Sequence, residues 1–267
     1  MSVLQRNQVK VQGTGKTCLV FSHGFGCDQN MWRLLAPRYA ARFRTVTFDH
    51  VGSGMSDLRA YDRQKYDSLD GYAGDVNEII DEVADGPVVF VGHSVSAMIG
   101  MLADLRRPGK IAGHVMVGPS PCYINDGDYI GGFNREDIDS LLETLEANYL
   151  GWAGSMAPAI MGAPQQPSLS EELTASFCRT DPAIAKHFAR VTFTSDNRAD
   201  VPNLKTPTLI VQSSDDFIAP MVVGEFLRDR FQKATLRVVE NIGHCPHLSA
   251  PNASANAINE FLASIKT

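Results

Sequence analysis

The sequence contains no uninterrupted apolar run of the length that a membrane-spanning helix requires, about 18 residues. Its beginning lacks the basic segment and following apolar run of a secretory signal, so we expect a cytoplasmic protein without a membrane anchor. Cysteine is scarce and odd in number, with five residues and no C-x-x-C pair. This pattern favours reduced thiols and indicates neither a disulfide framework nor a thiolate zinc site.

Basic residues are also few, since 24 lysines and arginines stand against 30 aspartates and glutamates, for a formal net charge of -6. Nucleic acids and anionic lipids are bound by clustered basic side chains, so we expect neither nucleic acid nor membrane as a partner. The 44% hydrophobic and 20% charged composition is typical of a soluble globular protein. A chain of 267 residues suits one α/β folding unit that carries an insertion.

The segment from Pro87 to Leu105 has the sequence PVVFVGHSVSAMIGMLADL, in which a short β-branched and aromatic run gives way to apolar residues at helical spacing. Small residues flank Ser94 between the two parts, as a hydroxyl raised on a sharp strand-to-helix turn requires. We therefore predict Ser94 as a nucleophile. The alternative is an ordinary turn with a helix-capping serine. Ser96 replaces the second glycine of the G-x-S-x-G pattern, and serine is small enough to be tolerated there.

A second turn, His23-Gly24-Phe25-Gly26, follows an apolar strand predicted at residues 17–22. Two glycines let the backbone bend and present amide hydrogens, which an acyl-transfer site needs where the oxyanion forms. We assign the backbone amides of Phe25 and Val95 to that oxyanion hole. The alternative is a plain glycine turn. The glycines at residues 52–54 lack the third glycine and the Lys-Ser/Thr pair of a nucleotide-binding loop, which favours a structural turn.

Near the end of the chain, Asp216 follows a strand predicted at 208–212 and His244 follows one predicted at 236–240. Sites of open α/β sheets gather at the carboxyl ends of strands. A serine hydroxyl needs an adjacent base, and the base needs a carboxylate to orient it, so we predict His244 and Asp216 in these roles. Asp215 is the rival carboxylate. Neighbouring residues that leave a strand point to opposite sides, which favours Asp216.

The sequence His244-Cys245-Pro246-His247 has a metal-binding interpretation as well. It lacks an H-E-x-x-H helix or a carboxylate cluster, and a proline separates the two ends, so we predict no metal site and no cofactor. His23 and His93 flank the predicted site. We interpret both as structural residues that are hydrogen-bonded to neighbouring loops.

The alternation of strands and helices breaks after a strand predicted at 115–117. About ninety residues follow before the strand at 208–212, whereas a parallel crossover needs only about 10 to 12. This insertion predicts a four-helix lid, with helices at 136–149, 152–161, 170–178 and 182–193. Asp181, before Pro182, is the expected cap of the last of these helices. The aromatic and methionine content of the lid indicates an apolar pocket beneath it. Other helices are expected at 69–83, at 254–265 and, with a bend at Pro37, at 30–42. We divide the chain into core residues 1–120, lid residues 121–200 and core residues 201–267.

Seven motifs resemble the hydrolase family that contains the bacterial stress-response regulator RsbQ: HGFGCDQNMW, FDHVGSGMSD, GHSVSAMIG, GPSPCYINDGDYIGGF, FCRTDPAIA, DDFIAP and GHCPHLS. They resemble less closely the karrikin and strigolactone receptor hydrolases of plants. The resemblance implies an α/β-hydrolase fold, a mostly parallel open sheet with helices on both faces and a four-helix lid inserted after the sixth strand. It also implies the triad Ser94, Asp216 and His244, and a pocket lined by Phe25, Phe133, Trp152, Phe193 and Ala219.

These features predict a serine hydrolase that cleaves a small hydrophobic ester or lactone through an acyl-enzyme. The resemblance implies a signalling role like that of RsbQ, beside a PAS-domain phosphatase or another signalling protein. The alternative is a ligand-sensing, receptor-like hydrolase with slow turnover that binds a partner protein through its lid. A cofactor-independent oxygenase or haloperoxidase shares the scaffold and is a third possibility. A haloalkane dehalogenase is disfavoured because its nucleophile position needs a carboxylate and holds Ser94 here.

Overall fold

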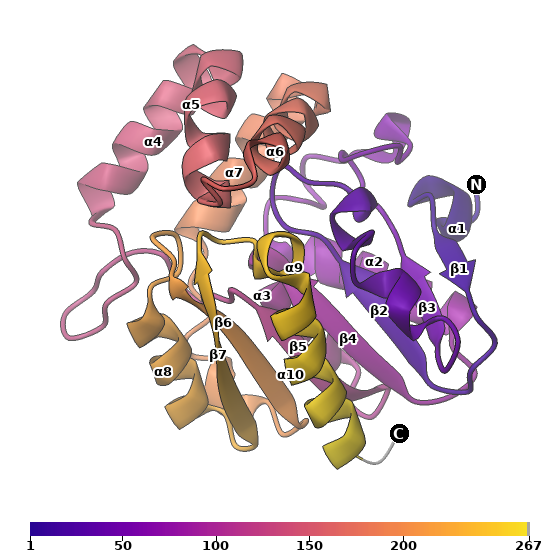
Figure 1. Cartoon of the computed structure of the whole chain (residues 1–267). Coiled ribbons are helices and arrows are strands. Elements are labelled where there is room, and N and C mark those ends of the chain that lie inside the picture. Colours follow the sequence, from indigo (N-terminus) through magenta and orange to yellow (C-terminus); the bar gives the residue numbers. More distant parts are fainter. Residues whose placement is uncertain (266–267) are drawn as a thin grey trace.

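A computed structural model describes residues 1–265, which fold around a seven-stranded sheet with the order β1-β3-β2-β4-β5-β6-β7 (Figure 1). β1 pairs with β3 in antiparallel fashion, and all other neighbouring strands are parallel. The predicted mostly parallel open sheet is therefore confirmed. The strands are β1 (Lys10–Gln12), β2 (Cys18–Ser22), β3 (Arg44–Thr47), β4 (Val88–His93), β5 (Ile111–Val117), β6 (Thr208–Asp215) and β7 (Ala234–Ile242).

Both faces of the sheet carry apolar side chains, because successive strand residues point to opposite faces and both faces are covered. In β2, for example, Val20 packs in one apolar cluster, and Leu19 and Phe21 pack in the other. The cluster with Val20 includes α2 (Leu69–Val83), α3 (Val95–Arg106) and α8 (Met221–Arg230), and the other includes α10 (Pro251–Ser264). The sheet is thus the middle layer of three, and the predicted helices at 69–83 and 254–265 are confirmed.

The α-helix predicted at 30–42, with a bend at Pro37, is wrong. The segment contains two short 3-10 helices instead, η1 (Gln29–Trp32) and η2 (Ala36–Tyr39). Pro37 cannot donate to the carbonyl of Arg33, four residues earlier, and its ring clashes with that carbonyl in an α-helix. Trp32 of η1 and Ala36 and Tyr39 of η2 still pack in the cluster that includes α10, whereas Met31 packs in the other cluster.

Four helices follow β5, namely α4 (Arg135–Ala147), α5 (Tyr149–Met161), α6 (Pro167–Arg179) and α7 (Pro182–Thr194). They match the four predicted helices to within a few residues. Figure 1 shows them together beyond the carboxyl ends of β6 and β7. The predicted insertion point is wrong by one strand, because the helices follow the fifth strand. Only β1 precedes β2 in the chain, and the residues before β1 form the helix α1 (Val3–Arg6).

Local capping and long-range packing both hold these four helices. Asp181 caps α7 as predicted, since its side chain accepts hydrogen bonds from the amides of Ala183 and Ile184. One apolar cluster runs from α4–α7 to the sheet without a break. The division of the chain at residues 120 and 200 stays a prediction, and its last two residues, 266–267, lie outside the described part.

The remaining short elements are η3 (Leu58–Ala60), η4 (Val201–Asn203) and α9 (Pro246–Ser249). α9 follows the loop after β7 and leads directly into α10. Within residues 1–265, no helix combines the length and the apolar character needed to cross a membrane.

Candidate active site

Ser94 lies at the sharp turn between β4 and α3. Its backbone has φ 56° and ψ -126°, a conformation that residues with a side chain rarely adopt. Such strain persists only where the surroundings impose it, and it gathers at functional sites. Gly92 makes the turn possible, because a Cβ there would lie 2.6 Å from the backbone oxygen of Ser96. The Ser94 amide is anchored to β5 by donating to the carbonyl of Val117 at 2.8 Å.

Three side chains from separate loops form a continuous chain of hydrogen bonds. Ser94 Oγ lies 2.7 Å from His244 Nε2, and His244 Nδ1 lies 2.7 Å from Asp216 Oδ2. All three residues are buried. The other carboxylate oxygen, Asp216 Oδ1, accepts hydrogen bonds from the amides of Ile218 and Ala219, which holds the carboxylate toward the ring. The fold therefore brings the predicted trio together, and the catalytic roles of its members stay predictions.

Asp215, the rival carboxylate, lies at the end of β6 with its side chain exposed. Its backbone oxygen accepts a hydrogen bond from the amide of Gly243 at 2.7 Å. This bond continues the pairing of β6 with the chain after β7. Asp216, the first residue after β6, contacts His244, whereas Asp215 is exposed to solvent.

The backbone amides of Phe25 and Val95 are the predicted oxyanion donors. Val95 is the first residue of α3, where an amide has no acceptor within its own helix. Phe25 lies in the turn after β2 and lines a cavity beside Ser94. In the described part of the chain, neither amide donates a hydrogen bond to another group. Both donors are thus unused, and their role in an oxyanion hole stays a prediction.

Ser96 is fully buried, and its side chain fits where the elbow pattern has glycine. Its hydroxyl donates to the carbonyl of His23 and accepts from the hydroxyl of Ser22. His50 Nε2 lies 2.9 Å from Ser96 Oγ and 3.0 Å from Ser22 Oγ. Because both hydroxyl hydrogens are used, His50 carries its hydrogen on Nε2 and donates it to this pair. Sequence reasoning missed the network because Ser22 is 74 positions away from Ser96.

His23 and His93 hold neighbouring loops, which confirms their structural interpretation. His23 Nε2 accepts a hydrogen bond from the amide of His50, and His93 Nε2 donates to the carbonyl of His244 at 3.0 Å. Burial, with a smaller contribution from nearby histidines, lowers the pKa of His50 and of His93 well below the ordinary 6.5. These two rings are therefore neutral near pH 7, and His93 supports the backbone of His244.

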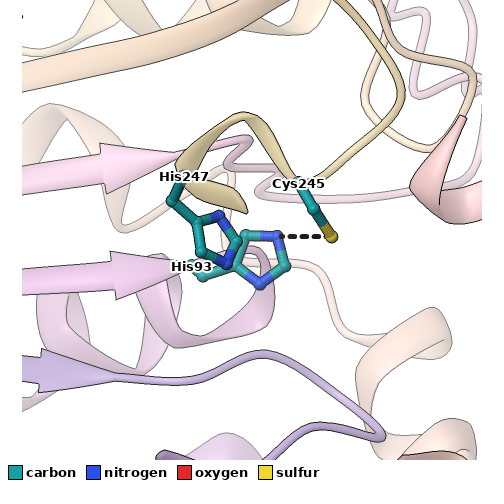
Figure 2. Close-up of side chains that lie close together, drawn as sticks. All are labelled: His93, Cys245 and His247. Atoms are coloured by element: carbon teal, nitrogen blue, oxygen red, sulfur yellow. Dashed lines mark hydrogen bonds between the residues drawn. The ribbon is translucent and has the colours of Figure 1, made fainter. Parts of the chain in front are cut away.

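Figure 2 shows that His93, Cys245 and His247 lie close together, each with a ligand atom within 4.8 Å of the others. Metal-ligand distances of about 2.0 to 2.3 Å place the ligands of tetrahedral zinc roughly 3.5 Å apart, so this cluster is wider than a zinc site. His93 Nε2 also already donates to the carbonyl of His244. Burial raises the pKa of the Cys245 thiol and so disfavours a thiolate ligand. In this arrangement the three residues do not fit a metal ion.

A cavity of about 30 Å³ lies against Ser94 and His244. Its wall is mostly apolar and comes from the loop after β2, from α5, α6 and α7, and from the loops that follow β5, β6 and β7. The predicted apolar pocket therefore exists between the sheet and the four helices. Its hydroxyl groups belong to Ser94, Tyr123 and Thr192.

Of the five predicted pocket residues, Phe25 and Phe193 line this cavity, whereas Phe133, Trp152 and Ala219 do not. The ring of Trp152 packs edge-on against Phe177, a wall residue, at 5.4 Å, so Trp152 lies behind the wall. Phe133 packs beside Phe217 instead, and Ala219 uses its amide to hold Asp216. A sequence pattern does not distinguish a side chain in the wall from one behind it.

Tyr123 is a site residue that the sequence analysis did not single out. Its hydroxyl lies 3.3 Å from Ser94 Oγ, and its ring lines the cavity. Burial raises the pKa of Tyr123 to about 12, so the phenol stays protonated near pH 7 and can donate a hydrogen bond. The sequence signal that could have indicated Tyr123 was its position in a loop just after β5, because loops at the carboxyl ends of parallel strands form such sites.

Comparisons with known proteins extend over nearly the whole chain. Residues 19–257 match the Alpha/beta hydrolase family. A karrikin insensitive 2 receptor of Petunia hybrida is 37% identical over 251 residues, which cover 94% of this chain and 93% of that protein. A strigolactone esterase of Arabidopsis thaliana is 35% identical over 262 residues, which cover 98% of each. The structure of a hydrolase from Oleispira antarctica superposes with a TM-score of 0.94 at 40% identity, over 98% of this chain and 96% of that one.

These matches include the sheet and the four helices after β5, and they confirm the predicted α/β-hydrolase fold. They also confirm the resemblance to karrikin and strigolactone receptor hydrolases. Closer kinship with RsbQ stays a prediction. By its sequence and by its architecture, the chain belongs to the alpha/beta hydrolase family.

Proposed function

We propose that this chain is a serine hydrolase that cleaves a small hydrophobic ester or lactone through an acyl-enzyme. Membership of the alpha/beta hydrolase family supports hydrolysis. One contact supports the mechanism above all others, the 2.7 Å between Ser94 Oγ and His244 Nε2. In this scheme Ser94 is the nucleophile, His244 is the general base and Asp216 orients the base.

In the first half-reaction, Ser94 Oγ attacks the carbonyl carbon of the substrate while its proton passes to His244 Nε2. Asp216 keeps the other ring hydrogen on Nδ1 and stabilises the imidazolium that forms. The carbonyl oxygen becomes an oxyanion and accepts hydrogen bonds from the amides of Phe25 and Val95. The bond to the alcohol oxygen then breaks, and His244 returns the proton to that oxygen.

In the second half-reaction, a water molecule gives a proton to His244 and attacks the acyl group on Ser94. The tetrahedral intermediate collapses, the serine oxygen recovers the proton, and the acid leaves. For a lactone, acid and alcohol are parts of one hydroxy acid.

The cavity favours a small substrate. Its volume of about 30 Å³ compares with the roughly 10 to 15 Å³ that a single water needs. We therefore propose that α4–α7 form a lid that must shift to admit a substrate. Ser176 of α6 donates to the carbonyl of Gly26 at 2.9 Å, and this link between lid and core has to open if α6 moves away.

Labelling with a fluorophosphonate tests the nucleophile, since the reagent modifies a serine that a neighbouring base activates. We expect a single adduct on Ser94 by mass spectrometry of the folded protein. The Ser94→Ala variant and the urea-unfolded protein are the controls, and neither should carry the adduct. Absence of an adduct on Ser94 in the folded protein would contradict the proposal.

Two neighbouring carboxylates provide a matched test of the acid. Asp216→Asn removes the charge that orients His244, and we expect kcat on p-nitrophenyl acetate to fall about 10³- to 10⁴-fold. Asp215→Asn changes an exposed side chain, and we expect less than about a twofold change. Steady-state kinetics measure both, and equal losses would contradict the role of Asp216.

A second candidate is a receptor-like hydrolase with slow turnover that binds a partner protein through α4–α7. Relatives that are named karrikin insensitive 2 receptors favour it. An apolar side chain on this surface, Leu150 of α5, is 58% exposed. Two measurements separate the candidates. The first is hydrogen exchange of α4–α7 with and without a cleavable ester, and the second is the steady-state kcat on that ester. Turnover above about 1 s⁻¹ without ligand-dependent exchange would count against the receptor.

Finer parts of the biological role stay predictions. Signalling beside a PAS-domain phosphatase in a stress response derives from the resemblance to RsbQ. Location in the cytoplasm derives from the cysteine content, which favours reduced thiols.

A further inference from the structure

Thr192 of α7 lines the cavity and has a hydroxyl without a hydrogen-bond partner among the described residues. The residue lines the cavity beside Ser94 and is 1% exposed. Within residues 1–265, Thr192 Oγ1 has no hydrogen-bond partner. A hydroxyl that is removed from water without a compensating hydrogen bond costs free energy, and buried hydroxyls are for this reason normally paired.

Other threonines in the four helices pair their hydroxyls within their own helix or at its end. Each donates to the carbonyl oxygen four residues earlier, as seen for Thr144, Thr174, Thr180 and Thr194. Thr194 is two residues from Thr192 in the same helix and bonds to the carbonyl of Arg190 at 2.7 Å. Thr192 has the carbonyl of Phe188 at the same spacing and does not use it. Its hydroxyl is left for a group inside the cavity.

The other polar side chains of the wall are engaged or covered. The hydroxyls of Ser94 and Tyr123 bond to each other, and the hydroxyl of Ser94 also bonds to His244. His93 Nδ1 is also unpaired, but it is covered by Gly24, since a Cβ on that glycine would lie 2.6 Å from it. Among the side chains of the wall, Thr192 therefore offers unused hydrogen-bonding capacity. The oxygen of the attacked carbonyl is assigned to the amides of Phe25 and Val95, so the Thr192 hydroxyl is left for another part of the ligand.

We infer that the Thr192 hydroxyl binds a second oxygen atom of the substrate, remote from the scissile carbonyl. The inference rests on the proposed function, because it concerns the substrate of the same site. The substrate class is then a small ester or lactone with an ether, carbonyl or hydroxyl oxygen in an otherwise hydrocarbon frame. A site built to hydrogen-bond its substrate rejects an analogue that lacks the partner atom, because the buried hydroxyl is then left unpaired.

Two pairs of isosteric esters test this class, each pair differing by an oxygen in place of a methylene. The first pair, p-nitrophenyl methoxyacetate and p-nitrophenyl butyrate, changes the acyl part. The second pair, 2-methoxyethyl acetate and butyl acetate, changes the alcohol part. Each variant is compared with the wild type on both members of a pair, so differences in intrinsic reactivity cancel.

Thr192→Val keeps the shape of the side chain and removes the hydroxyl. We expect kcat/KM for the oxygenated member of at least one pair to fall about tenfold, with most of the change in KM, while its hydrocarbon match is unchanged or improved. Thr192→Ser keeps the hydroxyl and should restore the preference. Thr194→Val is the matched control on α7 and should leave both pairs unchanged.

Equal effects of Thr192→Val on both members of both pairs would overturn the inference and indicate a packing role. A lower Tm of unliganded Thr192→Val would also count against it, because the removal of an unpaired hydroxyl breaks no bond. Failure of the proposed function is distinguished by the absence of both turnover and Ser94 labelling. In that case calorimetry of the binding of 2-methoxyethyl acetate and butyl acetate still tests the inference. Only 2-methoxyethyl acetate should bind more weakly to Thr192→Val than to the wild type.

Discussion

Ser96 links α3, the helix that follows Ser94, to the loop that contains Phe25. Its hydroxyl donates to the carbonyl of His23, two residues before Phe25, and it also contacts Ser22 and His50. Glycine, the usual residue of the elbow pattern, has no side chain to make these bonds. In this chain the side chain of Ser96 therefore links the two segments that supply the amides of the proposed oxyanion hole.

The Ser96→Ala variant tests this role at the level of a single hydroxyl. We expect the free energy of unfolding to fall by about 1 to 3 kcal/mol, because buried partners of Ser96 lose a hydrogen bond. We also expect kcat/KM on p-nitrophenyl acetate to fall about tenfold as the Phe25 amide loses its fixed position. Urea denaturation and kinetics measure the two effects. An unchanged kcat/KM together with a loss of stability would mean that Ser96 has a structural role only. Ser155→Ala on α5 is the control.

At the scale of elements, the loop after β2 and helix α6 fit closely. The ring of Phe177 on α6 packs 5.5 Å from that of Phe25, and Ser176 bonds to the backbone of Gly26. Gly26 has φ +71, and a Cβ there would lie 1.7 Å from the Phe177 ring. Only glycine allows both the backbone conformation and the contact, so this turn fixes where α6 lies over the cavity.

Two glycine substitutions should therefore change stability in opposite directions. Gly26→Ala should lower the free energy of unfolding by roughly 2 to 4 kcal/mol, from a strained φ and from displacement of Phe177. Gly74→Ala should raise it by about 0.5 to 1 kcal/mol, because Gly74 lies in α2 with no atom within 4 Å of a new Cβ. Urea denaturation of both variants provides the comparison. A neutral Gly26→Ala would show that α6 adjusts freely and does not depend on this contact.

At the scale of the whole molecule, buried neutral histidines connect stability to pH. Burial lowers the pKa of His50 in the folded protein well below its ordinary 6.5. As the pH falls below about 6.5, the unfolded chain takes up a proton at His50 that the folded protein does not. Stability contributed by the neutral ring is thus complete above that pH and is lost below it.

We expect the free energy of unfolding to decrease between pH 6.5 and pH 5, with His50 contributing about 1.4 kcal/mol per pH unit. His50→Gln cannot titrate at this position, so its decrease over the same range should be shallower by that amount. Urea denaturation at pH 7.5, 6 and 5 measures the slopes. Identical slopes for the variant and the wild type would show that His50 does not carry this dependence.

The sequence by itself determined the local elements and the order of the chemical groups. The strand, turn and helix around Ser94 were predictable because the spacing of apolar residues and the small residues at the turn determine local structure over a few positions. The helices α4–α7 were predictable for the same reason, and the cap at Asp181 with them. The choice of Asp216 over Asp215 followed from the alternation of side chains along a strand.

Only the tertiary structure decided which distant side chains meet. The network of Ser96 with Ser22 and His50 and the bond between Tyr123 and Ser94 join segments that are apart in the chain. Packing between elements also brings Thr192, with its unpaired hydroxyl, to the cavity beside Ser94. The same holds for Trp152, an apolar helix residue that lies behind the cavity wall. Periodicity assigns a side chain to a buried face, but contacts between elements depend on how the layers pack, and a one-dimensional pattern does not contain that information.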